Sequence, residues 1–412
     1  LNSHNGANAD LCESCNKLWA EEGSDLCHFC EQDLNIGKNL TSANYIAYKF
    51  NESSTNYDIK LFDESPIYIS LLKDKITEEK YDLLVNIKDD NISPAVPEIL
   101  GTYSSYIPTF TDRGEKFELC KQCGDEECTE RKNYFENFPY LFSCLAASSV
   151  NGREKGLQAL GVLKADVDML GSIFSIGLGS KEINFSEIVS LSRMVDYYFS
   201  KVLPENFAKA KEVTYSNCSA KLDKNYIVYA GGDDLLILGP WDNLLLTSFY
   251  INDSFRDYTA NNDNVTISAG LSLVKPKYPI AMSAQMATNE EERAKESGRN
   301  AFSVFGESQK WNKWLRVLPL ANLLDESIQE NYFSMSFVRR LNRYAGQEKR
   351  YQENNDTKER KWIGMFQYDL GRNFYDNKKF NRDKKMQKAL DDLIDLFLEE
   401  KDGMRGVENF KL

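Results

Sequence analysis

Histidine is nearly absent from this chain, whose 412 residues contain only His4 and His28. Ser-His-Asp hydrolases, histidine-based metal nucleases and metalloproteases all need imidazole groups at defined positions. Two isolated histidines do not supply them. Any catalytic chemistry in this chain must therefore be built on carboxylates.

Long apolar runs and an excess of positive charge are also missing. No stretch reaches the ~18 consecutive apolar residues of a transmembrane helix, and the start at Leu1 shows neither Met nor a signal-peptide pattern. We expect a cytoplasmic protein without a membrane partner, and a fragment of something longer. The net charge of −13 argues against wholesale binding of a phosphate backbone, although a local basic patch or an RNA held by a protein partner stays compatible with it.

The composition that is present is that of a folded protein, with 42% hydrophobic and 12% aromatic residues. A chain of this length favours two or three domains. We expect an α+β protein with four segments: a zinc ribbon (1–40), a β-rich linker domain with a second cysteine cluster (41–150), a palm domain (151–307) and a C-terminal helical domain (308–412). Within the last segment, the charge-dense stretch 347–361 is expected to be a mobile connection.

Strand and helix patterns alternate regularly between residues 156 and 306. Strands are expected at 160–167, 226–230, 235–238, 265–274 and 301–305, and helices at 169–178, 185–203, 241–260 and 280–297. This order predicts an elaborated ferredoxin-like sheet, the palm of nucleotide cyclases and many polymerases.

Three aspartates are the candidate catalytic residues. Asp233 and Asp234 follow two glycines between apolar runs, which predicts a hairpin turn, and Asp166 ends an upstream strand. Nucleotidyl transfer uses two divalent metals about 3.5–4 Å apart, held mainly by oxygen ligands. We therefore expect Asp166, Asp233 and Asp234 to bind Mg²⁺ or Mn²⁺. A plain hairpin turn is the alternative, and for Asp168 a turn-forming or helix-capping role competes with metal binding.

Two basic residues near the end of the 280–297 helix are candidate phosphate ligands. Lys295 and Arg299 are four residues apart, so they would share one helix face and reach the same phosphates. The alternative is a solvated helix end in which Gly298 is the C-cap and the basic residues complement the helix dipole.

Seven of the nine cysteines lie in two groups. The first, with paired C-x2-C spacing, predicts a closed, structural zinc site: Cys12, Cys15, Cys27 and Cys30. The second group provides three sulfurs: Cys120, Cys123 and Cys128. A second zinc, with Cys144 as a fourth ligand, and reduced, partly buried cysteines remain alternatives for it. Without a secretion signal, this clustered spacing favours metal binding over disulfides, and a reducing compartment is expected.

These segments resemble the GGDEF and nucleotidyl-cyclase superfamily, and within it the large subunit of type III-A (Csm) CRISPR effector complexes. The resemblance rests on 160–171 (LGVLKADVDMLG), 231–234 (GGDD), 268–270 (SAG), 277–280 (KYPI), 294–295 (AK) and the cysteine ribbon followed by 34–40 (LNIGKNL). It implies an ATP-using enzyme of antiviral defence that makes cyclic oligoadenylate. Its partners would be crRNA, target RNA and the small helical and repeat-associated subunits.

The resemblance also implies roles for individual residues. Asp166 and Asp233 would hold the metal ions, and Asp234 would complete the site. Contacts to ATP would come from Gly231, Gly232, Met169, Leu170, Gly171, Ser172, Lys295 and Arg299. The adenine pocket is a guess from position at Phe174, Ile183 and Asn184.

The family's N-terminal HD nuclease domain and first palm are not in this sequence, so we expect half of an active site, with weak or no synthesis until the other palm is supplied. One alternative is a scaffold subunit that binds ATP without turnover. The other is a diguanylate cyclase, which the sequence disfavours, because Asp234 stands where those enzymes carry Glu and Phe174 where they carry the guanine-reading Asn.

Overall fold

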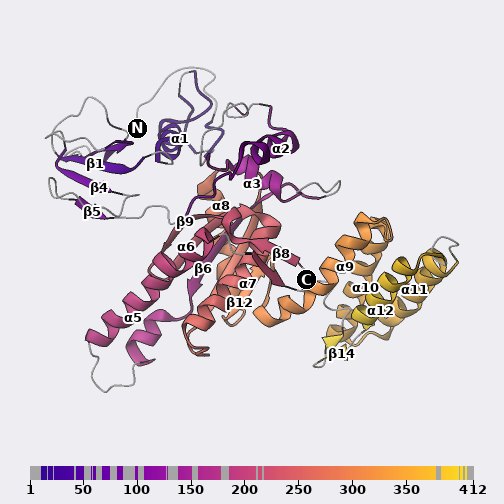
Figure 1. Ribbon diagram of the computed structural model, residues 1–412. Helices are drawn as coiled ribbons and strands as arrows, with labels where there is room; N and C mark the ends of the chain where they lie inside the picture. The colour runs from indigo at the N-terminus through magenta and orange to yellow at the C-terminus, as the bar shows by residue number, and fades with distance from the viewer. Residues whose placement is uncertain are drawn as a thin grey trace. The chain divides into compact units, whose positions relative to one another are not determined.

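The computed structural model describes residues 11–15, 17–21, 23–40, 43–50, 57, 59–61, 67–74, 81–86, 98–100, 106–126, 128, 138–150, 156–177, 185–209, 212–215, 218–376, 382–398, 400–401 and 404–405 (Figure 1). The chain divides into two compact units. One contains residues 1–107 and 277–282, and the other contains residues 108–276 and 283–412.

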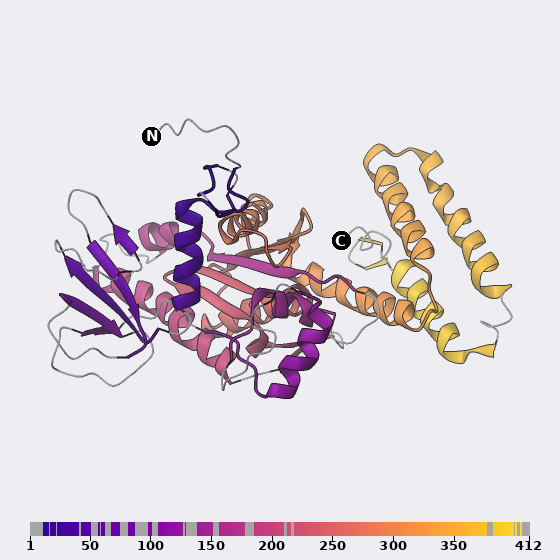
Figure 2. The ribbon, with the colours of Figure 1, turned by 90° about the horizontal axis from the view of Figure 1, so that it is seen from above.

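The first unit contains helix α1 (His28–Leu40) and a five-stranded sheet, visible in Figures 1 and 2. The strand order is β2-β3-β1-β4-β5, with bounds β1 Tyr45–Phe50, β2 Ile59–Leu61, β3 Ile67–Leu72, β4 Leu83–Asn86 and β5 Glu98–Leu100. Ile46, Ile69 and Val85 form its small apolar core. The described part of the β-rich segment 41–150 thus contains five strands.

A six-stranded mixed sheet dominates the second unit, in the order β13-β12-β11-β6-β10-β9. Its strands are β6 Leu160–Val167, β9 Tyr226–Gly231, β10 Asp234–Pro240, β11 Ile267–Val274, β12 Ala301–Val304 and β13 Glu307–Lys310. The central strand β6 pairs antiparallel with both β10 and β11, whereas β11 and β12 are parallel. The apolar run of β6 is mostly buried, as the sequence predicts for a strand covered on both faces.

Helices cover both faces of this sheet. On the face of Val162, helices α3 (Phe142–Ser148) and α8 (Ile280–Glu296) share one apolar cluster with the strands. The opposite face is covered by α7 (Trp241–Tyr258), since a Cβ on Gly161 would lie 3.0 Å from the Trp241 Cα atom. The closest approach between helix and sheet is at Gly270, where a Cβ would lie only 2.1 Å from the Glu291 backbone nitrogen. Its missing side chain lets the α8 backbone pack directly on β11.

The predicted order of strands and helices between 160 and 304 is confirmed, with additions that the sequence reading missed. The second helical stretch is longer than expected and runs through α5 (Phe185–Tyr197), η3 (Tyr198–Val202) and α6 (Leu203–Ala208); two short strands follow it, β7 (Glu212–Tyr215) and β8 (Cys218–Lys221). Upstream, helix α2 (Arg113–Cys123) was not expected. A β-bridge between Thr109 and Pro139 precedes α3.

The C-terminal segment is helical, as expected. Its main helices are α9 (Trp311–Gln329), α10 (Met335–Asn354), α11 (Trp362–Leu370) and α12 (Lys384–Leu398), packed around one apolar cluster. The expected mobile connection at 347–361 is wrong, since α10 continues to Asn354 and is followed by the 3-10 helix η5 (Thr357–Lys361). The buried Glu348 explains this order, because its carboxylate accepts a 2.6 Å hydrogen bond from the Trp362 indole. No helix in the described part of the chain has the length and apolar character needed to cross a membrane.

Candidate nucleotidyl-transfer site

Asp166 and Asp234 lie directly opposite each other on the antiparallel pair β6 and β10. Directly paired residues project their side chains to the same face of a sheet, so the two carboxylates share one face. On the other side of β6, Asp166 pairs with Ser268 of β11. The central strand thus brings Asp166 to the same end of the sheet as the glycine turn.

The glycine turn is the tight hairpin that the sequence predicts. Gly232 has a φ of 61°, the left-handed conformation that glycine adopts without steric cost. The Asp233 carbonyl accepts a 3.3 Å hydrogen bond from the Val167 backbone N–H, which ties the turn to the end of β6. Asp233 is therefore held beside Asp166 by the backbone itself.

Asp166 lies within electrostatic range of both Asp233 and Asp234. Burial raises the pKa of Asp166 to about 6; Lys295 opposes this shift, and the negative charges of Asp233 and Asp234 add to it. A half-buried carboxylate beside two others favours protonation or a nearby cation, because either one reduces the repulsion between the negative charges. Carboxylate oxygens are also the ligands that Mg²⁺ and Mn²⁺ prefer, so Asp166, Asp233 and Asp234 fit a divalent metal by donor type. Unlike the sulfurs of the first cysteine group described below, their oxygens are not gathered within 4.8 Å of one another.

Lys295 of α8 provides a positive charge at this edge. Its ammonium group is ion-paired with Asp166 and, at 2.5 Å, with Glu291 one helical turn earlier. Glu291 is also 3.6 Å from the ammonium group of Lys164 on β6. Burial acts to lower the pKa of Lys295, but its hydrogen bonds to Asp166 and Glu291 raise that pKa above its usual range. Sequence reasoning missed Glu291 and Lys164, although the four-residue spacing of Glu291 and Lys295 on one helix was a visible signal.

The Asp168 carboxylate is hydrogen-bonded to other parts of the fold, which favours a structural role over metal binding. Its carboxylate is buried and accepts hydrogen bonds from the hydroxyl groups of Thr266 and Ser268, each at 2.7 Å. A third bond, of 2.9 Å, comes from the backbone N–H of Asn300. These donors satisfy both carboxylate oxygens and join β6 to β11 and to the turn after α8.

Arg299 does not share a helix face with Lys295, so that expectation is wrong. Helix α8 ends at Glu296, and Gly298 follows in the left-handed conformation with a φ of 102°, which confirms the alternative C-cap reading. Arg299 itself has a φ of 57° and is exposed in the turn. The helix stops because this glycine reverses the chain toward β12.

The segment expected to contact phosphates follows Asp168 directly. Met169, with a φ of 54°, begins the short helix α4 (Leu170–Ser172), which continues as the π-helix η2 (Ile173–Gly177). Met169 and Gly171 are exposed, whereas Leu170 and Ser172 are half-buried. Phe174 is half-buried in η2, and the other two guesses for the adenine pocket, residues 183 and 184, lie outside the described residues.

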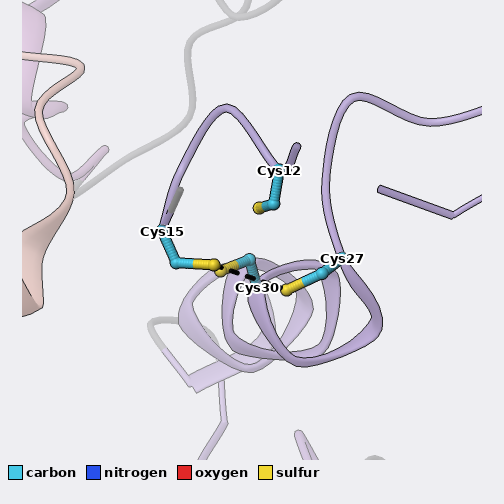
Figure 3. Close-up of side chains that lie close together, drawn as sticks. All are labelled: Cys12, Cys15, Cys27 and Cys30. Atoms are coloured by element: carbon cyan, nitrogen blue, oxygen red, sulfur yellow. Dashed lines mark hydrogen bonds between the residues drawn. The ribbon is translucent and has the colours of Figure 1, made fainter. Parts of the chain in front are cut away.

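The first cysteine group is gathered as the sequence predicts. The sulfur atoms of Cys12, Cys15, Cys27 and Cys30 all lie within 4.8 Å of one another (Figure 3), and their burial alternates between full and partial. Although burial raises it, hydrogen bonds from the backbone of Cys15, Cys27 and Ser14 bring the pKa of the Cys12 thiol down to about 6. Four convergent thiols, one of them readily ionised, fit a tetrahedral zinc ion.

The second cysteine group is not gathered in this way. In the described part of the chain, the first group is the cysteine cluster whose donor atoms lie close enough to share a metal ion. Cys120 and Cys123 lie on α2 and Cys144 on α3, and the Cys123 thiol donates to the Ser143 carbonyl at 3.5 Å. Burial, with the nearby sulfurs, raises the pKa of Cys144 to about 12. Reduced, partly buried cysteines therefore describe this group better than a second zinc site with Cys120, Cys123 and Cys128.

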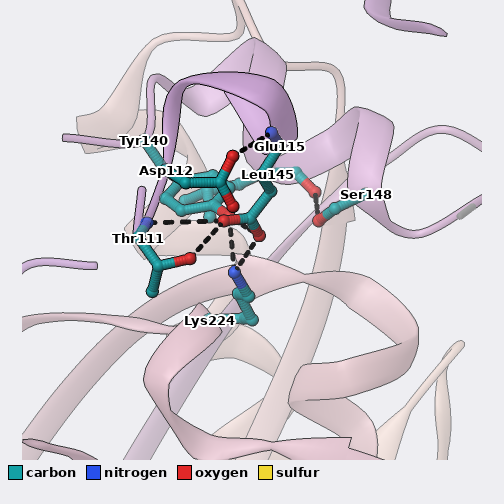
Figure 4. Close-up of polar contacts among 7 residues, drawn as sticks. All are labelled: Thr111, Asp112, Glu115, Tyr140, Leu145, Ser148 and Lys224. Atoms are coloured by element: carbon teal, nitrogen blue, oxygen red, sulfur yellow. Dashed lines mark hydrogen bonds and ion pairs between the residues drawn. The ribbon is translucent and has the colours of Figure 1, made fainter. Parts of the chain in front are cut away.

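A half-buried ion pair joins the helix α2, which carries Cys120 and Cys123, to the large sheet. Lys224, just before β9, lies 2.5 Å from the Glu115 carboxylate of α2, which also accepts a 2.6 Å hydrogen bond from the Tyr140 hydroxyl (Figure 4). Burial raises the pKa of Glu115, but the bonds from Lys224 and Tyr140 outweigh this effect and hold it at about 2. This network fixes α2 and α3 to the palm and needs no catalytic role.

Comparison with known proteins agrees with this geometry. Residues 159–303 match the family Cas10/Cmr2, second palm domain. That range contains the paired aspartates, the glycine turn and Lys295. Residues 159–303 therefore resemble the second palm domain of Cas10 proteins. The palm thus corresponds to the mixed sheet with α7 and α8, and the chain around it resembles the Cas10/Csm1 proteins of CRISPR subtype III-A.

Curated relatives share part of their length with this chain. The Cas10/Csm1 protein (subtype III-A) of Methanocaldococcus jannaschii, a CRISPR system single-strand-specific deoxyribonuclease, is 34% identical over 170 residues, which are 38% of this chain and 21% of that protein. The protein of the same name from Enterococcus italicus is 32% identical over 189 residues, 44% of this chain and 23% of that protein. The chain thus matches less than a quarter of the length of these relatives.

Solved structures extend the likeness of fold beyond the palm. A Csm1-Csm4 subcomplex of the type III-A CRISPR-Csm interference complex aligns with a TM-score of 0.55 and 19% identity, covering 89% of this chain and 50% of that one. The Csm1-Csm4 cassette in complex with one ATP aligns with a TM-score of 0.54 and 18% identity, covering 93% of this chain and 50% of that one. The cassette in complex with cA3 aligns with a TM-score of 0.53 and 18% identity, covering 90% of this chain and 49% of that one. At these identities the comparison shows the fold alone.

Proposed function

We propose that this chain carries the ATP-binding palm of a type III-A CRISPR effector and takes part in cyclic oligoadenylate synthesis by two-metal nucleotidyl transfer. The observation that carries the proposal is the direct pairing of Asp166 with Asp234, with Asp233 tied beside them by the Val167 bond. Such an arrangement concentrates negative charge at the end of a palm strand, where divalent cations and a triphosphate can meet.

Each residue of the site has a proposed task. Asp166, Asp233 and Asp234 would hold Mg²⁺ or Mn²⁺, which polarises the reacting phosphate and stabilises the charge that develops there. Lys295 would neutralise phosphate oxygens. The turn Gly231–Gly232 would let the nucleotide approach the backbone, and the segment 169–172 lies where further phosphate contacts are expected. This palm belongs to the GGDEF-like, ferredoxin-like type in our proposal.

Adenine is the proposed base. The structures of similar fold include Csm1-Csm4 cassettes with ATP, with pppApApA and with cA3, so adenine nucleotides and an adenylate product suit this palm type. The same structures motivate the proposed partners: a Csm4-like subunit, the other palm, crRNA and target RNA. Because a second palm would complete the site, this chain by itself should bind ATP with little or no turnover.

Calorimetric titration of ATP and of GTP, with Mg²⁺ or Mn²⁺, tests the proposal. The variant Asp233→Ala/Asp234→Ala should lose metal-dependent ATP binding, and ATP should bind better than GTP. Asp391 and Asp392 are adjacent, exposed aspartates on α12, so Asp391→Ala/Asp392→Ala is a control with the same loss of charge. Binding that survives in the first variant, or fails equally in both, would contradict the proposal and favour a scaffold role.

A further inference from the structure

Four side chains of alternating charge connect α8 to the palm strand β6. Lys164 and Asp166 lie on one face of β6, and Glu291 and Lys295 lie one turn apart on α8, which packs against that face through Gly270. The contacts run from Lys164 to Glu291 at 3.6 Å, from Glu291 to Lys295 at 2.5 Å, and from Lys295 to Asp166. Two positive and two negative charges thus form one short chain of ion pairs.

Glu291 is the most deeply buried of these four residues. Only 3% of its side chain is accessible, compared with 18% for Asp166 and 28% for Lys295. A carboxylate at this depth is too covered to bind a metal from solvent, and its charge is tolerated because two ammonium groups compensate it. Glu291 therefore retains its lysines even if another cation binds to Asp166.

Asp166 is in a different position, because the same ammonium group already neutralises a carboxylate proposed to bind metal. A divalent cation at Asp166 has to displace Lys295 from that carboxylate or share it. When this happens, Glu291 is the acidic partner that still holds the lysine. Lys295 would then remain at the metal edge as a fixed positive charge, available to anionic phosphate oxygens.

We propose that Glu291 is a positioning residue that retains Lys295 when Asp166 exchanges the ammonium group for a divalent cation. Lys295 then competes with a nucleotide-free metal ion for the Asp166 carboxylate. Once released from Asp166, it is held in place by Glu291 as a phosphate ligand. The inference rests on the proposed function, because it takes Asp166 as a metal ligand. It goes beyond that function by assigning a role to a buried residue outside the aspartate site.

Binding of Mn²⁺ alone, without nucleotide, is the measurement that tests this role. Free Mn²⁺ can be quantified by electron paramagnetic resonance in the wild type, Lys295→Met, Glu291→Gln and the double variant. Lys295→Met should tighten Mn²⁺ binding roughly three- to fivefold, the size of effect expected from removing a partly exposed ion pair. Glu291→Gln should weaken it by a similar factor, because Lys295 then has Asp166 as its remaining acidic partner in the chain of ion pairs.

The double variant separates positioning from a general charge effect. If Glu291 acts through Lys295, Glu291→Gln has no further effect once Lys295 is Met, and the double variant equals Lys295→Met. If Glu291 merely adds negative charge, the two effects sum. Additive effects, or Glu291→Gln binding Mn²⁺ as the wild type does, would overturn the proposal.

Two further variants keep the test decisive. Glu291→Asp retains the buried charge but shortens the reach to Lys295. It should weaken Mn²⁺ binding when Lys295 is present and have no effect in the Lys295→Met background. This variant keeps the test usable if Glu291→Gln folds poorly. Asp233→Ala/Asp234→Ala tests the metal site itself. If the wild type binds Mn²⁺ no better than this variant, the proposed function fails and the positioning role with it. If the variant loses binding while the Glu291 substitutions change nothing, the positioning role alone is refuted.

Discussion

The backbone N–H of Gly232 donates a 2.8 Å hydrogen bond to the Oδ1 atom of Asp196, a residue of α5. The same oxygen lies 3.6 Å from where a Cβ on Gly231 would be. An exposed helix residue therefore fixes the conformation of the glycine turn that precedes the two aspartates. Sequence reasoning did not single out Asp196, because nothing in the sequence links it to a turn more than thirty residues later.

The first prediction concerns this bond. Asp196→Ala should loosen the turn and weaken Mn²⁺ binding about two- to tenfold, the range for losing one hydrogen bond of roughly 0.5–1.5 kcal/mol. Asp196→Asn, which keeps an acceptor oxygen, should retain most of the affinity. Hydrogen exchange at residues 230–236 would show whether the turn opens. Equal affinity of the alanine variant and the wild type would show that the turn does not depend on Asp196.

The second prediction separates Asp166, near the end of β6, from Asp168, which directly follows that strand. Asp168→Ala leaves three donors without their acceptor, so it should lower the free energy of unfolding by about 1–3 kcal/mol or more, measured by urea denaturation. Asp166→Ala should abolish metal binding at a smaller cost in stability. If Asp168→Ala were as stable as the wild type but lost Mn²⁺, the structural role assigned to Asp168 would be wrong.

The third prediction is a pH dependence of metal binding. The pKa of Asp166 is raised to about 6, so its carboxylate becomes protonated as the pH falls through 6, and Mn²⁺ affinity should fall over the same range. Asp166→Asn should bind more weakly and lose this part of the pH dependence. Calorimetry at a series of pH values measures the Mn²⁺ affinity of both proteins. If the affinity of Asp166→Asn changed with pH in parallel with that of the wild type, the prediction would be contradicted.

The same shift has the opposite consequence for the stability of the metal-free protein. Because the folded pKa of Asp166 lies above the ordinary aspartate value, the native state binds more protons than the unfolded state between about pH 4 and 6. Protonation should therefore stabilise the fold as the pH falls through this window, and Asp166→Asn should remove that contribution. Urea denaturation at each pH, in chelator, measures it.

The fourth prediction concerns the cysteines. The purified chain should release zinc to a chelating dye, and Cys12→Ser or Cys27→Ser should reduce the zinc content. Cys120→Ser/Cys123→Ser should leave it unchanged, because those sulfurs are not gathered around a common point. Chelation should unfold the region around α1 while leaving the palm folded. A zinc content that depends on Cys120 and Cys123 would restore the second site.

Much of the palm could be read from the sequence because its signals are local. An apolar run such as 160–167 is buried on both sides, and a glycine turn between two such runs makes a hairpin whatever surrounds it. The C-x2-C pairs are equally local, since each pair already brings two sulfurs close together. Errors occurred where local signals mislead: the charged stretch 347–361 looked mobile, yet the buried bond between Glu348 and Trp362 orders it.

By itself, the sequence determined the order of strands and helices in the palm, the glycine turn with its aspartates, and the four-cysteine cluster, because each depends on residues close together in the chain. Only the tertiary structure decided which side chains act together. Asp166 and Asp168 look alike in the sequence, but Asp168 meets hydroxyl groups 98 and 100 residues away, whereas Asp166 meets Lys295. Such partners are chosen by the packing of β11 and α8 on β6, and no local pattern encodes that packing.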